Sequence, residues 1–153
     1  MNAQIHHTAE VQSPNLGEGT VVWQHTIVLK GAQIGKDCNL NCFCFVENDV
    51  RVGDRVTVKS GVQLWDGMTV EDDVFIGPNA TFTNHRDPKS KQPPAEFDKI
   101  VLQNGCSVGA NATVIGPCVI GSNSLVAAGA VVTKDVPPNV VVAGNPARIL
   151  CER

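Results

Sequence analysis

The chain has 153 residues, a formal net charge of −3 and an apolar fraction of 42%. The length predicts one domain spanning 1–153, and the near balance of charges argues against nucleic acid or an acidic membrane surface as a partner. The first residues lack the layout of a secretion signal, and no apolar run approaches the roughly 18 residues of a membrane helix. We therefore expect a soluble cytoplasmic protein.

Residues 1–15 are expected to form an N-terminal cap. Ile5 and Val11 stand six positions apart, and the spacing then slips by one near Ser13 and Pro14. Because the open end of a stack of strands exposes unpaired backbone, some non-repeating cover is expected there.

From Leu16 to Phe82 every sixth residue is apolar, and from Val22 onward a second small or apolar residue stands two positions before each of these. The period of six fits neither a helix nor a long strand. The two tracks point to the same side of a short strand. The first track is Leu16, Val22, Val28, Ile34, Leu40, Val46, Val52, Val58, Leu64, Val70, Ile76 and Phe82, and the second is Thr20, Thr26, Ala32, Cys38, Cys44, Val50, Val56, Val62, Met68, Val74 and Ala80.

Turn-forming triplets such as Gly53-Asp54-Arg55 and Trp65-Asp66-Gly67 separate the short strands. Short strands alternating with corners predict an all-β fold, a parallel β-helix of hexapeptide repeats. Each repeat can bury its apolar side only by stacking on its neighbours.

A loop is predicted at about 83–99. The next apolar site after Phe82 is expected at position 88 and is found only at Leu102, so one corner of the repeat has been enlarged. The intervening segment is polar and proline-rich, and a long loop inside so regular a repeat is more often functional than a tolerated insertion. The repeats then continue over 100–132, and 133–153 are expected to form a closing segment.

Four of the six cysteines fall on the inward track, namely Cys38, Cys44, Cys106 and Cys118. A buried thiol behaves as a small apolar side chain. These positions predict free thiols in a reducing compartment, and neither a disulfide nor a metal site.

Four runs of residues resemble one family: Leu64-Trp65-Asp66-Gly67, Asp72-Asp73-Val74-Phe75-Ile76-Gly77-Pro78, Phe82-Thr83-Asn84 and Pro88-Lys89-Ser90-Lys91. The chain resembles the left-handed β-helix acyltransferases, most closely the N-acetyltransferases of nucleotide-linked 3-amino sugars. The resemblance implies a left-handed helix in which three repeats close one coil. It also implies a homotrimer with active sites between subunits.

If three repeats make a coil, Asn48, Asp66 and Asn84 form a polar column beside the loop, with Glu47 at the same corner and Trp65 adjacent to Asp66. Corner Asn and Asp residues often only satisfy turn backbone, and this reading stays open for Asn48. For Asp66 and Asn84 we favour a role in binding substrate.

His85, at the root of the loop, is the candidate general base, since acyl transfer to an amine releases a proton and imidazole titrates near neutral pH. Asp87 is a candidate to orient it. The resemblance instead implies that Asn84 and Asp66 contact the sugar amine, and that in some members the thioester sulfur takes the proton. All three residues remain candidates, with positioning ranked first.

Ala127, Ala128 and Gly129 form a corner of very small residues, which lets a ligand or another subunit approach the backbone closely. The resemblance implies that this segment, with Gly109, runs along the pantetheine arm of coenzyme A. It further implies that Lys134, Pro146 and Arg148 face the adenine and phosphates.

The predicted function is acetyl-CoA-dependent N-acetylation of a dTDP-linked 3-amino-3,6-dideoxyhexose by direct attack of the amine, in a pathway such as O-antigen synthesis. Arg86, Lys89 or Lys59 are candidates to meet the pyrophosphate. The alternatives are a UDP-linked 3-amino sugar, O-acetylation of a small acceptor, and a non-catalytic scaffold. A γ-class carbonic anhydrase needs three histidines around zinc, which this pattern does not bring together.

Overall fold

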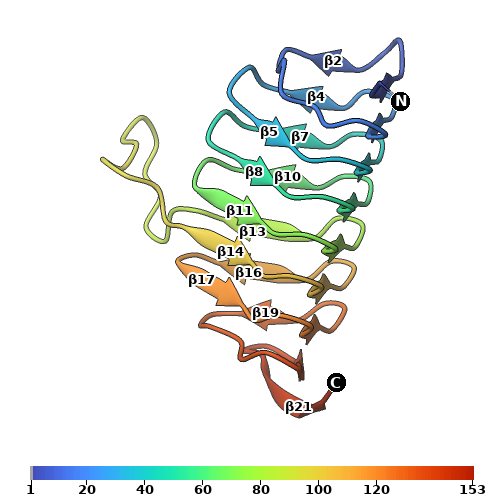
Figure 1. The fold of residues 1–153 in the computed structure, drawn as a ribbon. Helices are drawn as coiled ribbons and strands as arrows, with labels where there is room; N and C mark the ends of the chain where they lie inside the picture. The colour runs from blue at the N-terminus through green and yellow to red at the C-terminus, as the bar shows by residue number, and fades with distance from the viewer. Residues whose placement is uncertain (1) are drawn as a thin grey trace.

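The computed structural model describes residues 2–153, so Met1, the first residue of the predicted cap, lies outside the described range (Figure 1). Short strands follow a single axis in a stack of coils, from the N-terminus at one end to the C-terminus at the other, and one loop projects from the side. Residues 2–153 contain no helix long and apolar enough to cross a membrane.

The strands build three faces. The first face is one sheet of β1 (Gln4–Ile5), β3 (Val21–Val22), β6 (Asn39–Leu40), β9 (Thr57–Val58), β12 (Phe75–Ile76), β15 (Ser107–Val108), β18 (Leu125–Val126), β20 (Val140–Ala143) and β21 (Arg148–Glu152). The second face holds two separate sheets, β2 (Glu10–Val11), β4 (Ile27–Val28), β7 (Phe45–Val46) and β10 (Gln63–Leu64), then β13 (Thr81–Thr83), β16 (Thr113–Ile115) and β19 (Val131–Val132). The third face is β5 (Gln33–Ile34), β8 (Arg51–Val52), β11 (Met68–Val70), β14 (Ile100–Leu102) and β17 (Cys118–Ile120).

The strand register confirms that three repeats close one coil. Val21 pairs with Asn39, and Asn39 pairs with Thr57, so each coil advances the register by three repeats of six. Phe75 pairs with Ser107, a separation of one coil plus the inserted segment. Gln4 pairs with Val21, one position short of a full coil, as the slip in the N-terminal segment predicts.

Parallel pairing runs further toward the C-terminus than the expected end near Val132. Val136 forms a parallel bridge with Ile120, and β20 pairs in parallel with β18, both two positions short of a full coil. The turn between Val132 and Val136 is therefore shorter than the other corners by that amount. β21 then folds back antiparallel on β20 and closes the first face.

The core is the predicted pair of tracks. Apart from Leu16, which is half-buried, every residue of both tracks is buried, and the same pattern holds from Leu102 to Val132. Phe82 is the largest fully buried side chain, and each such side chain stabilises the fold by about 1.5–3 kcal/mol. The four inward cysteines are buried, and all six cysteines are free thiols.

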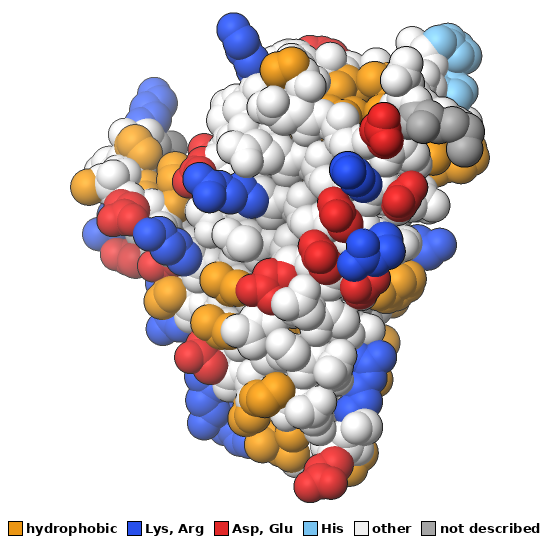
Figure 2. Space-filling view, in the orientation of Figure 1, with side chains coloured by type: hydrophobic (Ala, Val, Ile, Leu, Met, Phe, Trp, Pro, Cys, Tyr) orange, Lys and Arg blue, Asp and Glu red, His pale blue; other side chains and the backbone are white. Residues whose placement is uncertain are grey.

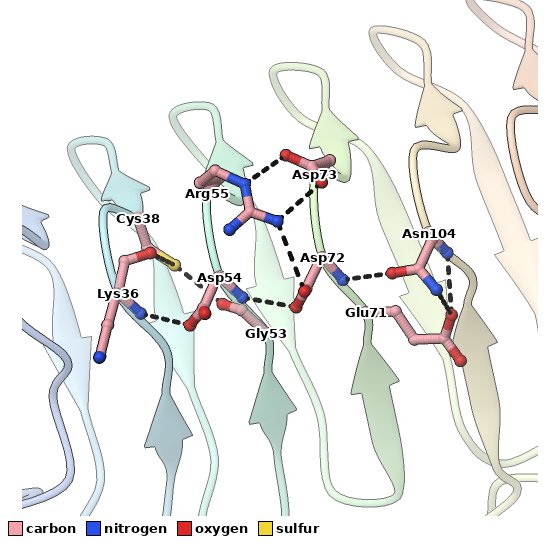
Figure 3. A network of polar contacts seen from close by, with 9 residues as sticks. All are labelled: Lys36, Cys38, Gly53, Asp54, Arg55, Glu71, Asp72, Asp73 and Asn104. Atoms are coloured by element: carbon pink, nitrogen blue, oxygen red, sulfur yellow. Dashed lines mark hydrogen bonds and ion pairs between the residues drawn. The ribbon is translucent and has the colours of Figure 1, made fainter.

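One corner joins the third face to the first and carries a polar ladder; we call it the ladder corner (35–37, 53–55, 71–73 and 103–105). Figure 3 shows its side chains bridging successive coils. The backbone N–H of Lys36 donates to Asp54 Oδ1 at 2.7 Å, and that of Asp54 donates to Asp72 Oδ1 at 2.8 Å. Each carboxylate thus accepts a hydrogen bond from a turn N–H of the preceding coil. These bonds satisfy backbone donors that lie outside the short strands.

Candidate functional site

A second corner joins the second face to the third, and we call it the loop corner (47–49, 65–67 and the loop 83–99). Asn84 Nδ2 donates to the backbone carbonyl of Asp66 at 3.0 Å, and Asp66 Oδ1 accepts from the N–H of Asp49 at 2.7 Å. Asn48 Oδ1 accepts from the N–H of Gly31 at 3.0 Å, one coil earlier. Asn48, Asp66 and Asn84 therefore stack at one corner, in the order in which the repeat places them.

Glu47 fixes the same corner from the preceding coil. Its Oε2 accepts from the N–H of Asp66 at 2.7 Å, and the N–H of Gly67 donates to the carbonyl of Asp49 at 3.0 Å. Within residues 2–153 the second carboxylate oxygen of Asp66 and the side-chain carbonyl of Asn84 have no hydrogen-bond partner. Three backbone N–H groups of the corner are thus hydrogen-bonded, while two side-chain acceptor oxygens stay available for a ligand.

Trp65 lies where the second face is interrupted. Its ring packs against Phe45, with centroids 5.8 Å apart, and its side chain is partly buried against the core. Its backbone N–H is directed to Met68 Sδ at 3.4 Å. β10 and β13 are stacked neighbours that belong to separate sheets. The break in hydrogen bonding therefore falls beside Asp66 and the root of the loop.

The loop is anchored at its base. The N–H of Asp98 donates to the carbonyl of Asn84 at 2.8 Å, and Arg86 Nε donates to the carbonyl of Gly116 in the next coil. His85 is half-buried, and its ring has no hydrogen-bond partner in the described part of the chain. Asp87 forms an ion pair with Lys89 at 3.4 Å and not a contact with His85, so the proposed Asp87–His85 pair is not formed.

The three cations considered for the pyrophosphate do not converge. Arg86 is drawn toward Gly116, and Lys89 is exposed and paired with Asp87. Lys59 follows β9 and begins a third corner, the one that also carries Ala127, Ala128 and Gly129. A different pair of cations, Arg51 and Lys99, lines a hollow of about 310 Å³ beside the loop corner.

The small-residue corner (109–111 and 127–129) joins the first face to the second near the C-terminal end. The N–H of Ala127 donates to the carbonyl of Val142, and the N–H of Gly129 donates to the carbonyl of Ala110. Both N–H groups are therefore already hydrogen-bonded within the chain. A Cβ atom placed on Gly129 would meet nothing within 4 Å, so this corner opens directly to the surroundings. Its surface is open, which suits an elongated ligand or a neighbouring subunit.

Lys134 and Arg148 line one cavity of about 490 Å³ at the C-terminal end, whose apolar wall includes Val132, Val142 and Ile149. Figure 2 shows hydrophobic side chains gathered around this end of the molecule. Pro146 lies in the turn between β20 and β21 and is not part of this lining. Lys134 and Arg148 therefore share one cavity. Ala127, Ala128 and Gly129 do not line it.

The buried thiols are poor nucleophiles. Burial raises the pKa of Cys106 to about 12, and burial followed by the charge of Asp135 raises the pKa of Cys118 to about 11. A thiol reacts as its thiolate, and these groups stay protonated at neutral pH. Neither cysteine is therefore suited to carry an acyl group in this fold.

A parallel β-helix of six-residue repeats, with a polar corner beside an inserted loop, places the protein in the class of hexapeptide-repeat proteins. Residues 99–134 match the family model described as bacterial transferase hexapeptide (six repeats). A dTDP-3-amino-3,6-dideoxy-α-D-galactopyranose 3-N-acetyltransferase from Aneurinibacillus thermoaerophilus is 44% identical over 145 residues, which cover 95% of this chain and 76% of the relative. The chain belongs to the hexapeptide-repeat acyltransferase family, and the resemblance to 3-amino-sugar N-acetyltransferases is confirmed.

Two solved structures share the fold. The N-acyltransferase AntD from Bacillus cereus, in complex with dTDP and coenzyme A, has a TM-score of 0.70 at 15% identity, covering 99% of this chain and 83% of that one. Perosamine N-acetyltransferase from Caulobacter crescentus, in complex with CoA and GDP-perosamine, has a TM-score of 0.61 at 22% identity, covering 99% of this chain and 58% of that one. At these identities the likeness supports the coil architecture alone.

Proposed function

We propose that this protein transfers the acetyl group of acetyl-CoA to the 3-amino group of a dTDP-linked 3-amino-3,6-dideoxyhexose. The observation that carries the proposal is the column in which the side chain of Asn84 reaches Asp66 at 3.0 Å beside the inserted loop. The relative with 44% identity, named for this chemistry, aligns over nearly the whole chain. The product would be a precursor for glycans such as an O-antigen, made in the cytoplasm.

The free oxygens of Asp66 and Asn84 are acceptors, and an amine is a donor. Two acceptors on a rigid corner hold the nitrogen with its lone pair toward the thioester, which removes orientational freedom before the reaction. The N–C bond then forms as the C–S bond breaks, and the amine proton passes to the departing sulfur, with or without His85 as carrier. Backbone N–H groups would stabilise the negative charge that develops on the carbonyl oxygen.

Acetyl-CoA is assigned to the C-terminal half. Lys134 and Arg148 share a cavity, and cationic side chains suit the phosphates of coenzyme A. Gly109, Ala127, Ala128 and Gly129 would follow the pantetheine arm, and Pro146 would lie near the adenine.

The acceptor column and the small-residue corner lie on different edges of one three-sided coil. One chain alone therefore does not bring the amine and the thioester face to face along these surfaces. A homotrimer, in which the loop corner of one subunit faces the small-residue corner of its neighbour, satisfies both assignments.

The test is a thiol-release assay with acetyl-CoA and a set of acceptors. A dTDP-linked 3-amino sugar should release free coenzyme A thiol and gain one acetyl group by mass spectrometry. Reaction only with the UDP-linked sugar would change the nucleotide, and reaction only with serine or a free sugar would support O-acetylation. Failure with every 3-amino sugar nucleotide would overturn the proposal, and failure to bind coenzyme A in a calorimeter would favour a scaffold.

A further inference from the structure

Beside the loop corner, on the third face, lies a hollow of about 310 Å³ lined by Asp49, Arg51, Gly67, Met68, Thr69 and Lys99. Arg51 lies on β8 and is registered directly against Thr69 of β11, so the two side chains project side by side from the sheet. Lys99 comes from the last residues of the inserted segment. The coil and the returning loop thus both contribute to the hollow.

The lining is suited to an anion. Arg51 has no ion pair in residues 2–153, and Lys99 has only an exposed partner, Glu96, at 3.4 Å. Asp49 is the one acidic residue of the lining, so two cations outnumber one carboxylate. A planar guanidinium with free N–H groups matches phosphate oxygens in geometry as well as charge.

The hollow is continuous with the acceptor column. Asp49 lines the hollow, and its N–H donates to Asp66 Oδ1 at 2.7 Å. Gly67 also lines it and follows Asp66 directly. A Cβ atom on Gly67 would stand 3.2 Å from the carbonyl oxygen of Asp98, so the returning loop forms a close wall there.

In a nucleotide-linked 3-amino sugar, the amine and the glycosidic phosphate are attached to the same six-membered ring. A site that holds the amine at Asp66 must therefore bind the diphosphate no further away than one sugar ring. Of the cations near this corner, Arg51 and Lys99 line the hollow that reaches Asp49 and Gly67, the residues bonded to and adjacent to Asp66. Arg86 is committed to Gly116, and Lys59 belongs to another corner.

We propose that Arg51 and Lys99 bind the diphosphate of the nucleotide sugar, with the Thr69 hydroxyl as a further donor. This inference rests on the proposed function, and it assigns the specificity for a nucleotide-linked over a free amino sugar to two residues. Because the loop supplies Lys99, the loop takes part in recognising the diphosphate.

The first experiment measures the binding of dTDP and of UDP by calorimetry. Arg51→Ala should weaken the binding of the diphosphate about tenfold or more, Lys99→Ala by less, and the double variant by more than either. Arg55→Ala is the matched control, because Arg55 is an exposed arginine of the same coil on the ladder corner. Arg55→Ala should bind dTDP with the affinity of the wild type. Added salt should narrow the difference in dTDP affinity between the wild type and Arg51→Ala.

The second experiment compares substrates with and without the diphosphate. Arg51→Ala should raise KM for the nucleotide sugar and leave KM for acetyl-CoA unchanged, so the ratio of kcat/KM for the nucleotide-linked over the free 3-amino sugar should fall about tenfold. Equal dTDP affinity in the wild type and the double variant would overturn the inference, as would a wild-type protein that binds neither diphosphate. A wild type that binds dTDP through Arg51 yet acetylates no 3-amino sugar would instead overturn the proposed function alone.

Discussion

The ladder corner and the loop corner solve the same structural problem with the same bond. Lys36 N–H donates to Asp54 Oδ1 at 2.7 Å, and Asp49 N–H donates to Asp66 Oδ1 at 2.7 Å. At the ladder corner the neighbouring charged groups are partners of one another, as in the pair of Arg55 with Asp73 (Figure 3). At the loop corner the column ends at a projecting loop, beside the His85 imidazole and the Arg51 guanidinium, neither of which has a hydrogen-bond or ion-pair partner within residues 2–153. A corner carboxylate by itself is therefore not evidence of a binding site. The unpaired polar groups around it distinguish a binding site from a structural corner.

The largest expected difference between the two corners is in kcat, measured after one asparagine of each corner is replaced by alanine. Asn84→Ala should lower kcat by about 100-fold, because a misplaced amine loses the orientation on which the reaction depends. It should cost stability only about 1 kcal/mol, since one hydrogen bond to Asp66 is lost. Thiol release and urea unfolding measure the two effects.

Asn104→Ala is the opposite case. Asn104 Oδ1 accepts from Asp72 N–H at 3.1 Å, and its Nδ2 donates to Glu71 at 2.8 Å. Its loss should lower the free energy of unfolding by more than that of Asn84 and leave kcat unchanged. Similar kinetic losses in both variants would mean that the loop corner has no special role.

A matched pair of carboxylates tests charge alone. Asp66→Asn and Asp54→Asn each keep the oxygen that accepts a backbone N–H, so the two stability changes should agree within about 0.5 kcal/mol. Asp66→Asn should lower kcat/KM for the amino sugar about tenfold, because the charged acceptor becomes neutral. Asp54→Asn should match the wild type in the same assay, and equal losses in both variants would contradict the comparison.

His85→Asn separates the two readings of the loop root. The ring of His85 has no hydrogen-bonded carboxylate in the described chain to orient it, and Asp87 is turned to Lys89. We therefore expect the variant to keep most of its kcat, whereas loss of a general base costs about 10²- to 10⁴-fold. A loss of that size in steady-state kinetics would assign the proton to His85 instead of the departing sulfur.

The fold was open to prediction because the repeat is strictly periodic. A period of six placed Leu64 and Phe82 in the core, and the coil of three repeats placed Asp66 next to Asn84. Contacts that depend on a non-periodic segment could not be predicted from this pattern. The partner of Asp87 follows from the conformation of the loop, and the place of Lys99 in the hollow at Arg51 follows from the return of that loop over Gly67.

The shift at the C-terminal end was missed for a related reason. Val136 pairs with Ile120 two positions short of a full coil, since the turn before it is shorter than the others. Because the spacing changes in that turn, a pattern of strict six-residue steps ends at Val132 although the strand pairing continues. Strand pairing tolerates such a shortening because the missing residues come from a corner and not from a strand.

The smallest expected effect belongs to the exposed ion pair of the ladder corner. The Arg55 guanidinium lowers the pKa of the Asp73 carboxyl below its ordinary value of 3.8, first through a hydrogen bond. A carboxyl whose pKa is lower in the folded state adds stability above its unfolded pKa and loses it as pH falls through the folded value. Both side chains are about half exposed, at 51% and 54%, so the contribution is small. Asp73→Asn should lower the urea midpoint slightly at neutral pH and not at all in acid well below pH 3.8. A constant difference across that range would show that the aspartate acts through the shape of the turn and not through its charge.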